Sequence, residues 1–147
     1  MPARLPLTLA ALLLLATPAL AEGIVVRDAR AYAALAGATS AAGYLVIDNQ
    51  GPADRLLGAT SPAVRSLTLH ESTESADGMI HMEAMAEGVA LPQGGAVELA
   101  PGGLHLMMMG LAVPLAPGAT IAVTLDFELG PDLTIELPVE IQAPPAG

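Results

Sequence analysis

The chain has 147 residues, the length of one domain, and its 15 acidic and 5 basic residues give a formal net charge of −10. A protein this acidic repels nucleic acid and anionic membrane surfaces, so we expect neither as a partner. The chain has no cysteine, which excludes a disulfide framework, a thiolate metal site and a blue-copper centre with a cysteine ligand.

The first 21 residues have the layout of a secretory signal peptide. Arg4 precedes an apolar run that starts at Leu5, and small residues at positions 19–21 provide a cleavage site. The run is too short to cross a bilayer, which takes about 20 apolar residues. We therefore expect residues 1–21 to be a cleaved signal peptide. Residues 22–147 should be a single periplasmic domain without a membrane anchor.

The exported part is predicted to be all-β and built from many short strands. Clusters of Gly, Pro and Asn form the turns between these strands. The first seven strand candidates are residues 24–27, 42–48, 55–59, 64–71, 78–85, 96–99 and 104–111. Short strands at this spacing are typical of a β-sandwich or barrel. Residues 28–35 could instead form a helical turn.

The last two strand candidates, residues 120–129 and 132–142, have the most regular pattern. Apolar side chains occupy every second position, from Ile121 to Leu129 and from Leu133 to Ile141. A period of two over this length indicates a strand with one buried face. Gly and Pro lie between the two segments, so we expect an antiparallel hairpin.

All the histidines and all but the first methionine lie between residues 70 and 109. They are His70, His81, His105, Met79, Met82, Met85, Met107, Met108 and Met109. A β core does not require this clustering, because Leu, Val, Ile and Ala supply its apolar side chains elsewhere. Thioether sulfur is a soft ligand that prefers Cu(I), and imidazole also suits copper. The cluster therefore predicts a Cu(I) site made of thioether and imidazole.

Alternation along residues 104–111 suggests which of these side chains act together. His105, Met107 and Met109 share one face of a strand, whereas Met108 shares the other face with leucines. We expect Met108 in the core, and His105 and Met107 as a pair of ligands. Whether Met109 joins them stays open. The alternative is that these methionines only fill gaps in the core.

Residues 78–85 are harder to interpret. His81 and Met82 are adjacent, so a regular strand points them to opposite faces unless a bulge intervenes. His70 ends the preceding strand candidate and is followed by acidic residues. The residue pattern alone leaves open the choice among His70, His81 and Met82, and also any role for Met85.

In this region the chain resembles the PCuAC family of periplasmic copper chaperones. That family has a histidine, a later methionine and then a His-x-Met motif, which match His70, Met82, His105 and Met107. Residues 54–56, 69–71, 77–79, 91–95 and 101–105 are also similar, and the resemblance covers about residues 41–129. Each long gap between the motifs is one residue longer here, and Glu71 stands where some members have a methionine.

The resemblance implies a cupredoxin-like antiparallel β-sandwich with Greek-key connections. It also implies that His70, Met82, His105 and Met107 bind Cu(I). The metal would be delivered to a copper acceptor protein, such as a cytochrome c oxidase subunit or another copper assembly factor. This favours His70 over His81 as a ligand, and we expect a monomer.

Two other functions are compatible with the sequence. One is a copper-sequestering or resistance protein with the same site, and the other is an exported structural sandwich without a metal. We expect no enzyme, because the chain has no Ser-His-Asp order, no His-Glu-x-x-His motif and no Gly-rich phosphate loop.

Overall fold

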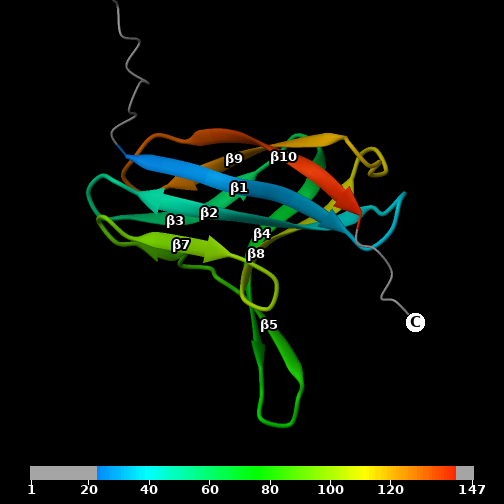
Figure 1. Cartoon of the computed structure of the whole chain (residues 1–147), viewed down its shortest axis with the longest axis horizontal. Coiled ribbons are helices and arrows are strands. Elements are labelled where there is room, and N and C mark those ends of the chain that lie inside the picture. The colour runs from blue at the N-terminus through cyan, green and yellow to red at the C-terminus, as the bar shows by residue number, and fades with distance from the viewer. Residues whose placement is uncertain (1–22, 142–147) are drawn as a thin grey trace, which may run out of the picture.

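The computed structural model describes residues 23–141 (Figure 1). These residues form ten β-strands: β1 (Ile24–Ala33), β2 (Ser40–Asn49), β3 (Asp54–Thr60), β4 (Val64–Glu74), β5 (Ile80–Ala84), β6 (Val89–Leu91), β7 (Ala96–Leu99), β8 (Leu104–Leu111), β9 (Thr120–Phe127) and β10 (Leu133–Ile141). Within this range no helix is long and apolar enough to cross a membrane. The expected signal peptide, residues 1–21, lies outside the described residues.

The strands form two layers that share one continuous hydrogen-bonded path. The order is β5-β4-β8-β2-β1-β10-β9-β3-β6, and β7 pairs with the second half of β2, beyond the part that pairs with β8. All neighbouring pairs are antiparallel except β1 and β10, where Ala31 and Val139 pair in parallel. The predicted all-β sandwich is confirmed, with this one parallel pair as a departure from a wholly antiparallel fold.

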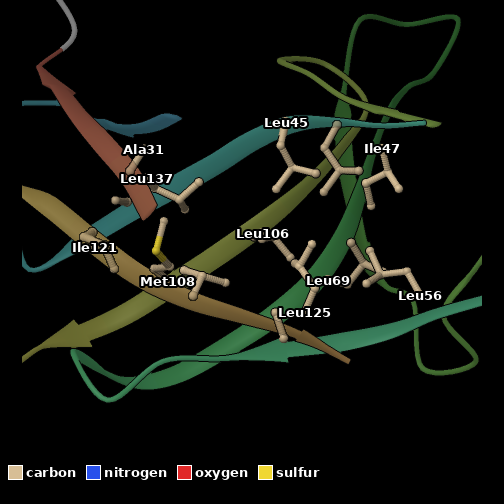
Figure 2. Close-up of a cluster of buried hydrophobic side chains, with 14 of the residues drawn as sticks. Ala31, Leu45, Ile47, Leu56, Leu69, Leu106, Met108, Ile121, Leu125 and Leu137 are labelled. Carbon is tan, nitrogen blue, oxygen red and sulfur yellow. The ribbon is translucent and has the colours of Figure 1, made fainter. Parts of the chain in front are cut away.

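Aliphatic side chains from both layers fill the core (Figure 2). Leu45 of β2 and Leu106 of β8 come from one layer, and Leu125 of β9 and Leu137 of β10 come from the other. Met108 is among them and has no exposed surface. The predicted alternation from Leu104 to Met109 is therefore confirmed, because consecutive side chains of a strand point to opposite faces. It ends at Gly110, which has a φ of 69°, and Leu111 is again buried in the core.

The expected C-terminal hairpin is also confirmed. Strands β9 and β10 pair antiparallel, with Val123 opposite Ile135. The buried face of β9 ends at Phe127, two residues earlier than the pattern indicated. Leu129 lies beyond the strand and is 76% exposed. The alternation in the sequence thus continues to Leu129, but the other layer covers the apolar side chains only as far as Phe127.

One local prediction was wrong, and one short strand was not predicted. Residues 28–35 do not form a helical turn, because β1 continues to Ala33 and pairs with β2 on one side and β10 on the other. A β-bulge between Arg27 and Arg30 accommodates Asp28, which has a φ of 55°. The strand β6 was not predicted. It has only three residues, which is too few for an alternating pattern to be recognised.

Asp54 connects the start of β3 to the β9–β10 turn. Its carboxylate accepts hydrogen bonds from the backbone N–H groups of Arg55, Leu129 and Gly130, with N···O distances of 2.7, 2.9 and 2.9 Å. Partial burial acts to raise the pKa of Asp54. The backbone donors outweigh burial and hold this pKa below its ordinary value. The charged form is thus the one that holds the turn.

We expect Asp54→Ala to lower the free energy of unfolding by about 1–3 kcal/mol at pH 7. Because the folded-state pKa is lowered, the charged form stabilises the fold above about pH 4, and this contribution disappears as the pH falls through the folded-state value. Urea denaturation at pH 7 and at acidic pH measures the effect, with the exposed Asp126→Ala as a control. If the difference in unfolding free energy between wild type and Asp54→Ala stayed constant with pH, the charged carboxylate would not be the source of the stabilisation.

Candidate metal centre

Strands β4 and β8 bring two of the predicted ligands directly opposite each other. They pair antiparallel, with His70 opposite His105 and Thr68 opposite Met107. Residues opposite each other on neighbouring strands project from the same face of a sheet. His70, His105 and Met107 therefore share the outer face, since the side chains between them, such as Leu106, point into the core.

The β4–β5 pair decides the position of the remaining candidates. Met82 lies opposite Ser72, which is two residues beyond His70 on β4, so Met82 shares the outer face. His81 lies opposite Thr73 and points the other way. The pairing has no register shift from His70 to Glu74, so no bulge turns His81 toward the site.

A surface depression of about 330 Å³ lies on this outer face. Its lining includes three of the four predicted ligands, Met82, His105 and Met107. His70 does not line the depression, but its ring lies edge-on to the His105 ring, with 5.8 Å between the ring centroids. The fold thus gathers the four residues that the PCuAC resemblance singled out.

The two histidines present nitrogen atoms without hydrogen-bond partners. His105 is 5% exposed, and its Nδ1 lies 3.0 Å from the Gly103 carbonyl oxygen, which can only accept a hydrogen bond. Nδ1 therefore carries the proton and Nε2 carries a lone pair. The Nε2 of His105 and the Nδ1 of His70 are buried and have no partner among the described residues. Buried polar atoms in this state are uncommon, and a metal ion would satisfy both.

The donor types at the site select a soft metal. Within residues 23–141 no group of three or more His, Cys, Asp or Glu side chains could hold a metal ion. The other soft donor atoms that line the depression beside the imidazoles are the thioether sulfurs of Met82 and Met107. Two imidazoles and two neutral thioethers suit Cu(I), whereas Mg(II) and Ca(II) require oxygen ligands.

The other methionines near the site do not line the depression. Met109 shares the outer face with Met107 but lies farther along β8, opposite Ser40 and Ser66. Met85 packs against the core, and Met79 is exposed before β5.

Sequence reasoning missed Tyr44, which lines the depression from β2. Its ring lies near Tyr32, with 5.6 Å between centroids, and the Arg30 guanidinium is 5.8 Å from the Tyr44 ring centroid. Burial raises the pKa of Tyr44, and the charge of Arg30 partly opposes this. No local pattern identifies Tyr44, because its place beside the site follows from the pairing of β2 with β8.

Comparisons with known proteins agree with this architecture. The LpqE-like family, which is named after a lipoprotein, matches residues 24–139. A protein of Leifsonia xyli subsp. xyli (strain CTCB07), the lipoprotein Lxx21020 by name, is 41% identical over 120 residues, which are 82% of this chain and 71% of that protein.

Two solved structures are also similar. The copper-bound PCuAC domain from PmoF2 has a TM-score of 0.65 and 29% identity, covering 82% of this chain and 94% of that domain. CuI-DR1885 from Deinococcus radiodurans has a TM-score of 0.61 and 30% identity, covering 82% of this chain and 81% of that one. The PCuAC resemblance is thus confirmed at the level of the fold.

Proposed function

Since the chain belongs to the LpqE-like family and shares its fold with copper-bound PCuAC domains, we propose that it is a Cu(I) chaperone. His70, Met82, His105 and Met107 hold one Cu(I) ion as cargo. The observation that carries this proposal is the pair of buried, unpartnered imidazole nitrogens beside a depression lined by two thioethers.

The ligand set suits a carrier that must both hold and release its metal. Thioether sulfur is neutral, so binding through Met82 and Met107 requires no proton release, and only the imidazoles meet competition from protons. No thiolate takes part, so the site cannot be lost to disulfide formation in an oxidising compartment. The copper keeps its oxidation state throughout, and the protein acts as a carrier and not as an enzyme.

We further propose that the carrier works in the periplasm and supplies an acceptor in copper-centre assembly, such as a cytochrome c oxidase subunit. The signal-peptide pattern of residues 1–21 and the lipoprotein after which the family is named support export. Incubating the loaded chain with a copper-free oxidase fragment tests delivery. Transfer of copper supports a chaperone, whereas retention of copper would indicate a sequestering protein.

We expect the chain to bind about one Cu(I) ion, and to bind Mg(II) and Ca(II) weakly or not at all. Titration under reducing conditions against a competing Cu(I) chelator measures the stoichiometry and affinity. The matched control is the double variant His105→Ala/Met107→Ala, which removes two of the proposed ligands from one strand. Absence of binding at micromolar copper would contradict the proposal and favour a metal-free structural sandwich.

A further inference from the structure

The β4–β5 hairpin has an exposed apolar face next to the candidate site. β5 is an edge strand of the sheet, and all of its residues are exposed. Figure 1 shows that β5 and the adjoining end of β4 extend away from the stacked layers. Ile80 and Met82 are 61% and 57% exposed, and both lie on the outer face that carries His70. Exposed apolar side chains on an edge strand are typical of an interaction surface.

From His70 onward, the same hairpin carries only negative charge. Its acidic residues are Glu71, Glu74, Asp77 and Glu83, and no Lys or Arg follows Arg65 in the sequence. Glu74 lies opposite Ile80 on the outer face. Glu71 and Glu83 lie directly opposite each other on the other face of the hairpin, an arrangement that destabilises a strand pair. Among the described residues, none of these carboxylates forms an ion pair. A positively charged partner would relieve this repulsion.

We propose that the protruding β4–β5 hairpin docks a basic acceptor protein. Positively charged side chains of the acceptor would contact Glu74 beside Ile80 and Met82, and would reach Glu71 and Glu83 around the exposed edge of the hairpin. A second copy of this chain fits poorly, because two acidic hairpins repel each other, and anionic membranes and nucleic acids are excluded by the same repulsion. The acceptor role rests on the proposed Cu(I) function, whereas the docking surface can be tested without copper.

Docking here would bring the acceptor to the metal through Met82, which is both a proposed ligand and a hairpin contact. The bonds from Cu(I) to Met82 and then to the other ligands break as bonds to two acceptor thiolates form. The copper remains Cu(I), and the two thiol protons pass to the solvent. The exposed edge strand is thus the side from which the cargo leaves.

The first experiment uses the copper-free chain and two synthetic peptides. Both carry one Cys-x-x-Cys pair, flanked by lysines in one peptide and by glutamates in the other. With the isotope-labelled chain, we expect the lysine peptide to shift the amide NMR signals of residues 71–84, and the glutamate peptide to shift none. Uniform shifts over the sandwich, or none, would overturn the docking surface.

A charge-matched pair of variants sharpens this test. Glu71→Gln/Glu74→Gln/Glu83→Gln removes the hairpin charges, and Glu98→Gln/Glu136→Gln/Glu140→Gln removes as many exposed charges from β7 and β10. We expect the hairpin variant to bind the lysine peptide about tenfold more weakly, and the control to stay within about twofold of wild type. Equal losses in both variants would show that net charge alone attracts the peptide, and would overturn the proposal.

The second experiment measures transfer from the Cu(I)-loaded chain. The peptides offer identical thiols, so we expect the lysine peptide to take copper about tenfold faster at low salt, with the difference lost at high salt. Chelator competition gives each variant's Cu(I) affinity, so that rates are compared at equal occupancy. Copper binding with equal transfer to both peptides would overturn the docking surface alone. Docking of the lysine peptide by a chain that binds no Cu(I) would overturn the proposed function alone.

Discussion

Met107→Ala should weaken Cu(I) binding by about tenfold or more while leaving the fold nearly as stable as wild type, and Met108→Ala should do the reverse. Tenfold corresponds to about 1.4 kcal/mol of binding free energy. Met107 lines the depression on the outer face, whereas Met108 has no exposed surface and packs among core side chains from both layers (Figure 2). Truncating a buried methionine to alanine costs about 2–5 kcal/mol of stability.

Chelator competition and urea denaturation of the same two variants measure both effects. Met109→Ala is the matched control, because Met109 lies on the same strand, is exposed and does not line the depression. We expect it to change neither Cu(I) affinity nor stability appreciably. Lost affinity in Met108→Ala with retained affinity in Met107→Ala would mean that the ligands are on the other face of β8. Lost affinity in Met109→Ala would extend the site along the strand.

His70→Ala should also weaken Cu(I) binding by about tenfold or more, whereas His81→Ala should stay within about twofold of wild type. His70 lies opposite His105 and has a buried Nδ1 without a partner among the described residues. His81 is on the same hairpin but is exposed and points to the opposite face. Because the β4–β5 register is regular, the His81 ring points away from the depression.

The measurement is again chelator competition, joined by the imidazole NMR signals of the wild-type chain during Cu(I) titration. The His70 and His105 signals should move together as copper is added, and the His81 signals should stay in place. Each variant replaces one histidine of the same hairpin by alanine, so each serves as a control for the other. A loss confined to His81→Ala would remove His70 from the site and place the metal on the opposite face of the hairpin.

Alternation along a single strand was enough to predict much of the fold. The bounds of residues 96–99 and 104–111 agree with β7 and β8, and the placement of Met108 in the core is correct, because alternation depends only on local backbone geometry. The strand β6 and the second half of β1 were not found. A three-residue strand carries no period, and the bulge at Asp28 interrupts the pattern of β1.

The choice of metal follows from residue types, and these are visible in the amino-acid order: no cysteine, and histidines and methionines concentrated between residues 70 and 109. Which of them can act together depends on how different strands align. Alternation says that His81 and Met82 point to opposite faces, but only the pairing of β4 with both β5 and β8 places Met82 on the face that carries His70 and His105. Strand pairing depends on residues that are far apart in the sequence, so alternation along one strand does not determine it. A shift of one residue in the register would exchange the two faces.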